Sequence, residues 1–266
     1  MPLTLQTCAT ADAAGAALAS DAAARYLGGG TLIVRHANEG DVSFSRYVRS
    51  TDPELSAISV EGGRVTLGAS VTMGRILADK RLHCLADAAH AVGGPAIRNM
   101  ATAGGNLYAP APYGDLGVAL LALDASVEIG GKTLPLADFL RDRDTIHGRS
   151  VLTAISFALP ADGALRFLKV SRVKPKGVSV VTIAAHLEER NGTFASARLA
   201  YGCMADRPVR AAAVEAALAG KPRTADGIAD ALAIATDGVE PVTDAIASAW
   251  YRAEVLPVHL GRLLLA

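Results

Sequence analysis

A segment rich in glycine and proline, residues 98–115, constrains this chain most, because ordinary helix or strand cannot run through it. The segment reads RNMATAGGNLYAPAPYGD. Gly104 and Gly105 carry no Cβ, so another molecule can approach their main chain closely. Thr102 and Asn106 place short polar side chains beside amides that can form an anion-binding concavity. The segment therefore predicts a loop, either an ordinary turn or the binding loop of a phosphate-bearing ligand.

A second glycine loop lies near the start of the chain, in the phrase YLGGGTLIV over residues 26–34. Residues suited to strands flank the glycines, so we expect a strand over residues 25–27 that continues over residues 31–34. The two loops could be turns of an α/β domain, or both could donate amides to the pyrophosphate of one dinucleotide. The chain has no GxxxxGK[ST] and no GxGxxG with an acid downstream, which excludes a Walker site and a nicotinamide Rossmann site.

Composition and charge narrow the classes of partner. The chain of 266 residues is 51% hydrophobic and 20% charged, which suffices for a packed core, and its formal net charge is zero. No basic run interleaved with aromatics occurs, so we expect no nucleic-acid partner. Three widely spaced cysteines without CxxC or HExxH favour reduced thiols in a cytoplasm and no metal site in this chain. Without a secretory signal or an apolar run of ~20 residues, we expect a cytoplasmic protein with no transmembrane segment.

The pattern of elements divides the chain into three expected domains, residues 1–51, 52–161 and 162–266. The first is a small α/β unit with a helix over residues 12–18. The second is a larger α+β unit that begins with a hairpin around Gly62 and Gly63. Its remaining elements are expected as helices at 73–79, 82–92 and in the apolar run after Asp115, a helical turn at 138–144, and strands at 126–129 and 151–159.

The third expected domain is an antiparallel sheet followed by helices. Its three strands are expected at 165–172, 178–187 and 193–201, the last two joined through Asn191 and Gly192, a strong hairpin signal. Helices are expected at 209–219, 226–235 and 244–265. The last helix carries a stripe that covers the sheet or meets another subunit. The stripe comprises Ala249, Arg252, Leu256, His259, Leu260 and Leu263.

Both glycine loops resemble those of the FAD-binding medium subunits of molybdenum hydroxylases, the carbon monoxide, xanthine and aldehyde dehydrogenase type. GGGT at 28–31 is similar to their AGGT-type loop, and TAGGN at 102–106 is similar to their T-[hydrophobic]-GGN loop. The phrases DLGVALLALDASVEI, LPLADFL and FLKVSR extend the resemblance over nearly the whole chain. It implies an α+β fold: a PCMH-type two-part FAD-binding region, followed by a C-terminal antiparallel three-stranded sheet covered by helices.

The same resemblance implies a set of FAD-binding positions. The first glycine loop and the second would hold the pyrophosphate, Asp115 would reach the ribityl or flavin region, and Lys169 would lie near the flavin. The full set is Gly28, Gly29, Gly30, Thr31, Thr102, Ala103, Gly104, Gly105, Asn106, Asp115 and Lys169.

Three departures from the family's pattern bear on FAD affinity. Leu32 stands where the family commonly has Asp, Asn or Ser, so one polar contact to the cofactor is expected to be missing. Ala103 replaces a larger aliphatic residue and removes packing under the second loop. The segment 173–179, VKPKGVS, lacks the charged and aromatic sequence that the family usually has at this place.

The function implied by the resemblance is electron transfer by an oxidoreductase subunit, with no catalytic residue and no metal in this chain. A small partner subunit with [2Fe-2S] clusters would bring electrons from a large subunit with a molybdenum cofactor. FAD in this chain would pass them to NAD⁺, a quinone, a cytochrome or oxygen. The assembly would be a dimer of heterotrimers. Two alternatives stay open: a free-standing flavin-dependent oxidase or dehydrogenase of the vanillyl-alcohol-oxidase type fold, and a scaffold whose loops have lost their ligand.

Overall fold

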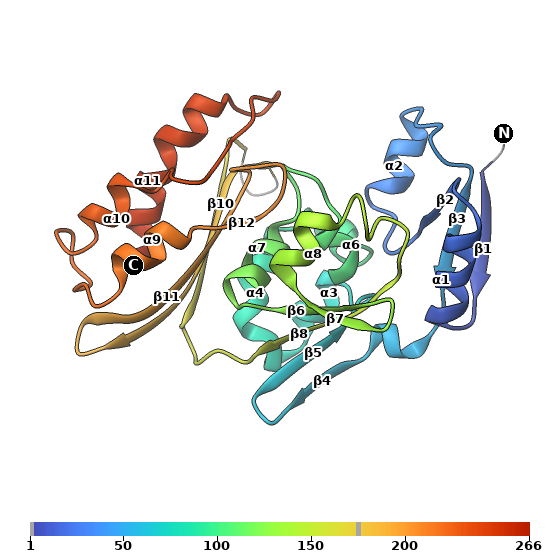
Figure 1. Cartoon of the computed structure of the whole chain (residues 1–266), viewed down its shortest axis with the longest axis horizontal. Coiled ribbons are helices and arrows are strands. Elements are labelled where there is room, and N and C mark those ends of the chain that lie inside the picture. Colours follow the sequence, from blue (N-terminus) through green and yellow to red (C-terminus); the bar gives the residue numbers. More distant parts are fainter. Residues whose placement is uncertain (1–2, 174–176) are drawn as a thin grey trace.

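Three sheets follow one another along the chain, and helices separate or cover them (Figure 1). The computed structural model describes residues 3–173 and 177–266. The first sheet is parallel, whereas the second and third are antiparallel, with helices packed on both. This arrangement confirms the expected α+β class.

The first sheet has three strands in the order β1-β3-β2. They are β1 (Thr4–Cys8), β2 (Ala24–Tyr26) and β3 (Arg46–Ser50). Helix α1 (Ala11–Ser20) buries Ala14 and Leu18 against the sheet, and the Thr10 side chain caps its first turn. The strand at 24–26 agrees with the sequence, whereas β1 and β3 were not predicted.

The strand expected over residues 31–34 is wrong, because helix α2 (Ile33–Asn38) lies there instead. Apolar and β-branched residues favoured a strand. Gly30, however, adopts a positive φ of 74°, which turns the chain, and its carbonyl accepts a hydrogen bond from the Val34 amide. This bond closes a helical turn at the place where a strand would have to continue.

The second sheet has five antiparallel strands in the order β4-β5-β8-β6-β7. They are β4 (Ile58–Glu61), β5 (Arg64–Gly68), β6 (Ser126–Ile129), β7 (Lys132–Pro135) and β8 (Leu152–Ala158). The predicted hairpin is confirmed, with Gly62 and Gly63 both at positive φ. β7 was missed, although Gly130 and Gly131 form the same kind of turn before it.

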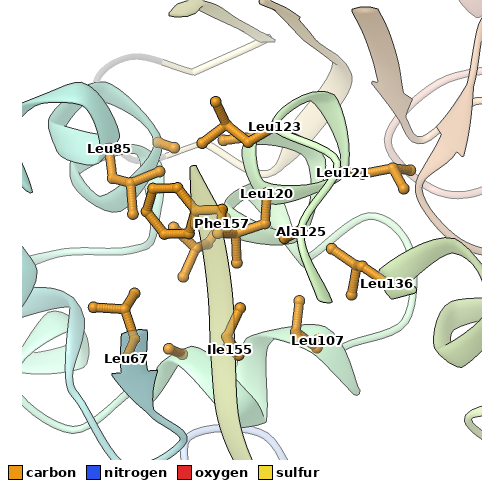
Figure 2. Packing of buried hydrophobic residues seen from close by; sticks show 14 of the residues in the cluster. Leu67, Leu85, Leu107, Leu120, Leu121, Leu123, Ala125, Leu136, Ile155 and Phe157 are labelled. Atoms are coloured by element: carbon orange, nitrogen blue, oxygen red, sulfur yellow. The ribbon is translucent and has the colours of Figure 1, made fainter. Parts of the chain in front are cut away.

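Short helices connect the strands of the second sheet, and one of them lies in the core. They are η1 (Pro53–Ser56), α3 (Met73–Ala78), η2 (Lys80–Leu85), α4 (Ala86–Ala91), α5 (Pro95–Arg98), α6 (Ala103–Leu107), α7 (Asp115–Ala122) and α8 (Leu136–Asp142). Every residue of α7 is buried. Figure 2 shows Leu120 of this helix in one cluster with Phe157 and Ile155 of β8. The helix expected over 82–92 is in fact two pieces, η2 and α4.

The third sheet has four antiparallel strands in the order β12-β11-β10-β9. They are β9 (Leu165–Ser171), β10 (Ser179–Arg190), β11 (Thr193–Gly202) and β12 (Val209–Arg210). The three predicted strands are confirmed. The expectation of three in all is wrong by one, because residues 209–210 pair with β11 before their helix begins. The helices are α9 (Ala212–Leu218), α10 (Ala229–Ala233) and α11 (Ala249–Leu265).

Both faces of the third sheet are covered. Ala184 and Ala200 belong to the core that contains α7, whereas Ile183 and Tyr201 pack with α9 and α11. Leu256 and Leu260 of the predicted stripe are fully buried in this second core, so the stripe covers the sheet. Arg252 in the same stripe is only 1% exposed, and its Nη1 donates to the carbonyls of Val180 (2.6 Å) and Cys203 (3.4 Å).

Replacing Arg252 by methionine tests this buried guanidinium. We expect Arg252→Met to lower the free energy of unfolding by about 3–5 kcal/mol, since two buried carbonyls and the Asp244 carboxylate lose their donor. Denaturant unfolding measures the loss. Arg262→Met changes an exposed arginine of the same helix and should alter stability by less than about 0.5 kcal/mol. Equal stabilities of the two variants would contradict this role.

Candidate functional site

A cleft of about 490 Å³ lies where the first sheet, the helices of the second and strand β9 meet. All the sequence-predicted binding residues except Ala103 line it. They are Gly28, Gly29, Gly30, Thr31, Thr102, Gly104, Gly105, Asn106, Asp115 and Lys169. Ala103 is instead completely buried. The fold thus brings together residues from three distant parts of the sequence.

The first glycine loop presents unpaired amides to this cleft. Among the described residues, no acceptor takes a hydrogen bond from the amides of Gly28, Gly29, Gly30 or Thr31. The loop also lies directly against the segment before the second loop. A Cβ on Gly29 would lie 1.9 Å from the Met100 carbonyl oxygen, and one on Gly28 would lie 3.0 Å from the Thr102 hydroxyl oxygen. Absence of side chains therefore lets the two segments touch.

The second glycine segment is not the loop that the sequence predicts, because residues 103–107 form helix α6. Thr102 caps this helix, and its hydroxyl oxygen accepts from the Gly105 amide at 3.1 Å. The Gly104 amide donates to the Ala69 carbonyl at 2.8 Å. Close packing requires glycine at position 104, because an added Cβ would lie 2.8 Å from the Cβ of Ala69. Tertiary contact with β5 thus overrides the low helix propensity of glycine.

Most hydrogen-bonding capacity of this second segment is used within the protein. The Ala103 amide donates to Val71, and the Asn106 amide to Thr102. The Asn106 side-chain oxygen accepts from the Gly117 amide at 3.2 Å, which ties α6 to α7. Asn106 Nδ2 has no acceptor among the described residues, so it is a side-chain donor that this segment offers to the cleft.

Asp115 is a buried carboxylate with three side-chain donors. It is the first residue of α7 and only 6% exposed. Its Oδ1 accepts from Ser179 Oγ and Thr182 Oγ1, both at 2.8 Å. Its Oδ2 pairs with Lys169 Nζ at 2.9 Å. These contacts satisfy the charge of the carboxylate and hold α7 against β9 and β10.

Lys169 has one N–H donor that is available to a ligand. Its ammonium donates to Asp115 and to the Ala91 carbonyl, at 2.9 and 2.8 Å. An ammonium has three donors, and the third has no acceptor among the described residues. Because Lys169 lines the cleft, this donor is available there.

Burial shapes the acid-base behaviour of groups at the site. Burial raises the pKa of the Cys203 thiol to about 12, and the nearby Asp115 charge adds to the effect. Burial likewise raises the pKa of Tyr26 and of Tyr108, two phenols that line the cleft. All three groups therefore stay protonated and neutral near pH 7.

Several residues of the site were not found by sequence reasoning. Ser179 and Thr182 hold Asp115, and their hydroxyls lie far from it in the sequence. Arg25 and Arg35 line the cleft as well. The Gly-Thr signal of the first loop could have drawn attention to the two arginines beside it, whereas nothing local marks the others.

Two of the three departures noted in the sequence fall at the same cleft. Leu32 lines it, as do Gly177 and Val178. The central part of the 173–179 segment, residues 174–176, lies outside the described residues. Arg98, by contrast, braces its own loop, since its Nη1 donates to the carbonyls of Gly93 (2.6 Å) and His90 (3.2 Å).

The described ranges contain neither a cluster of metal-binding side chains nor a membrane-spanning helix. No group of three or more His, Cys, Asp or Glu side chains there could hold a metal ion. No described helix is both long and apolar enough to cross a membrane.

Comparison with known proteins identifies the family. The FAD-binding domain of molybdopterin dehydrogenases matches residues 2–160, more than half of the chain. The chain belongs to this family. The C-terminal domain of carbon monoxide dehydrogenase flavoproteins matches residues 166–266.

Relatives of this flavoprotein family include subunits of several dehydrogenases. The xanthine dehydrogenase FAD-binding subunit of Escherichia coli O157:H7 is 29% identical over 214 residues, which cover 73% of this chain and 71% of the relative. The nicotinate dehydrogenase FAD-subunit of Eubacterium barkeri is 29% identical over 217 residues, which cover 76% and 73%.

Solved structures share the fold over the whole chain. Carbon monoxide dehydrogenase from Hydrogenophaga pseudoflava superposes with a TM-score of 0.90 at 22% identity, covering 99% of this chain and 96% of the other. Quinoline 2-oxidoreductase from Pseudomonas putida 86 superposes with a TM-score of 0.89 at 26% identity, covering 100% and 96%. The expected PCMH-type fold is therefore confirmed.

A methyl group at Gly29 tests the contact between the two glycine segments. We expect Gly29→Ala to separate them and to destabilise this flavoprotein by at least about 1–3 kcal/mol, because the new Cβ meets the Met100 backbone. Thermal unfolding measures the loss. Gly15→Ala, in α1 with nothing within 4 Å of its Cβ, should instead stabilise by about 0.5–1 kcal/mol. A Gly29→Ala protein as stable as the wild type would contradict the contact.

Removal of one hydroxyl tests the support of Asp115. We expect Thr182→Val to cost about 1.5–3 kcal/mol, the usual contribution of a hydrogen bond to a charged group. Thr182→Ser keeps the hydroxyl and should lose less stability. Thr145→Val removes an exposed hydroxyl that donates to a backbone carbonyl and serves as the control. Denaturant unfolding compares the three variants, and equal losses in Thr182→Val and Thr145→Val would refute the role of Thr182.

Proposed function

We propose that this chain is the electron-transfer subunit of a molybdenum hydroxylase. It receives electrons from [2Fe-2S] clusters of a partner subunit and passes them through FAD to an external acceptor. The observation that carries the proposal is the set of unpaired amides at Gly28–Thr31, which line a cleft shared with Lys169 and Asp115. Family membership supplies the identity of the cofactor.

The residues of the cleft fit a dinucleotide. Unpaired amides of the first loop suit a pyrophosphate, because successive backbone N–H groups form an anion-binding concavity. Arg25 and Arg35 line the same cleft and add positive charge. The Asn106 side-chain amide and the third proton of Lys169 offer further donors. FAD held there would supply the redox chemistry, since a flavin exchanges electrons singly or in pairs.

Roles of the individual residues follow from their free hydrogen-bonding groups. Gly28, Gly29, Gly30 and Thr31 bind the pyrophosphate through their amides. Thr102, Ala103, Gly104 and Gly105 chiefly shape the wall on which the first loop rests, because the amides of the last three and the Thr102 hydroxyl oxygen already have protein partners. Asn106 donates from Nδ2. Asp115 fixes Lys169, and Lys169 orients the flavin end of the cofactor.

The subunit names of the relatives support an assembly with partner subunits. A xanthine dehydrogenase FAD-binding subunit and a nicotinate dehydrogenase FAD-subunit are parts of larger enzymes. We propose a small iron-sulfur partner and a large molybdenum-cofactor partner, combined as a dimer of heterotrimers in the cytoplasm. Hydroxylation of substrate takes place in the large subunit. Within this chain, we propose that the domains meet near residues 51 and 161.

An absorbance spectrum of the protein purified from its native source tests this function. We expect flavin bands near ~375 and ~450 nm, the ordinary bands of the cofactor, with one FAD for each copy of this chain. Metal analysis of the separated chains should find iron and molybdenum in copurifying partners. Flavin in a chain without partners would support the free-standing oxidase instead, and absence of flavin would leave the two glycine segments with a structural role only.

A further inference from the structure

Helix α2 is attached to the rest of the protein more loosely than its neighbour in the first sheet. None of its six residues is buried, whereas α1 buries Ala14 and Leu18. In Figure 1, α2 stands between the first sheet and the central helices. It follows directly on the first glycine loop, so a change in the loop would carry the helix with it.

One side-chain contact joins α2 to the central part of the chain. Arg35 Nη1 donates to the Tyr113 hydroxyl at 3.0 Å, and the guanidinium carbon lies 5.8 Å from the centre of the Tyr113 ring. Within residues 3–173 and 177–266, no other side chain of α2 forms a hydrogen bond to another segment. Arg35 Nε also pairs with Glu39 at 3.0 Å, which orients the guanidinium from within the same helix.

Tyr113, on the other side of the contact, is held firmly. It lies in the connection between α6 and α7, where Pro110 and Pro112 restrict the backbone. The Tyr113 amide donates to the Pro110 carbonyl at 2.9 Å, and Gly114 follows with a positive φ of 92°. The contact therefore joins a loosely packed helix to a stiff loop.

Both partners belong to walls of the proposed FAD cleft. Ile33 and Arg35 of α2 line it, and Pro112 and Tyr113 of the connecting loop line it as well. We propose that α2 is a movable wall of this cleft, and that the contact of Arg35 with Tyr113 is a clasp that closes the wall over the bound dinucleotide and slows its release. The proposal rests on the proposed function, since the retained ligand is the FAD of that site.

The rate of FAD release tests the clasp. The full chain is purified with its partner chains and FAD, then diluted, and the rise in free-FAD fluorescence is followed with time. We expect Tyr113→Phe and Arg35→Leu each to release FAD about two- to tenfold faster, the effect of losing one net hydrogen bond. The double variant should release it no faster than the faster single variant, because both changes break the same contact.

Matched controls separate the clasp from general effects of these substitutions. Tyr251→Phe and Arg141→Leu change residues outside the cleft lining and should keep the wild-type release rate. Unchanged release from both single variants, or effects that add in the double variant, would overturn the clasp while FAD binding itself stands. A wild-type protein that binds no FAD would overturn the proposed function, and the clasp with it.

Discussion

The buried carboxylate of Asp115 is the interaction on which the arrangement of the site depends. A charge in a protein interior is costly unless it is paired and hydrogen-bonded. Here one carboxylate oxygen accepts hydrogen bonds from the hydroxyls of Ser179 and Thr182, and the other forms an ion pair with the ammonium of Lys169. These donors come from β9 and β10, so the charge is stabilised only when the third sheet is docked on α7. The same docking sets the ammonium of Lys169 at the cleft.

Close packing of α7 reinforces that docking. The helix is buried along its whole length. Its Val118 packs directly on Gly202 of β11, where an added Cβ would lie 2.8 Å from Val118 Cγ2. Apolar contact alone would allow the helix to slide on the sheet, since burial of apolar surface has little directional preference. Fixed hydrogen-bond geometry at Asp115 removes that freedom, and a packed interior transmits the position to the cleft.

Sequence reasoning succeeded at two hairpins with a local signal, overlooked a third before β7, and failed where the pairing was tertiary. Asn191-Gly192 and Gly62-Gly63 mark their hairpins directly, and both turns have the positive φ angles that these residues favour. Parallel pairing of β1 with β3 has no such marker, because it joins residues more than forty positions apart, as Thr4 with Arg46. Ser179 and Thr182 were missed for the same reason, since Asp115, their shared partner, lies 64 and 67 residues away.

The two glycine segments look alike in sequence, but they differ in how many of their amides already have protein partners. In the second segment the amides of Ala103 and Gly104 donate to carbonyls of the protein, and Gly104 is small because Ala69 lies beside it. In the first, the amides of Gly28 to Thr31 have no acceptor among the described residues. A phosphate binds most favourably to donors that need not first break a hydrogen bond within the protein. The anion binding that we propose therefore depends on the first segment, while the second keeps that segment in place through Met100.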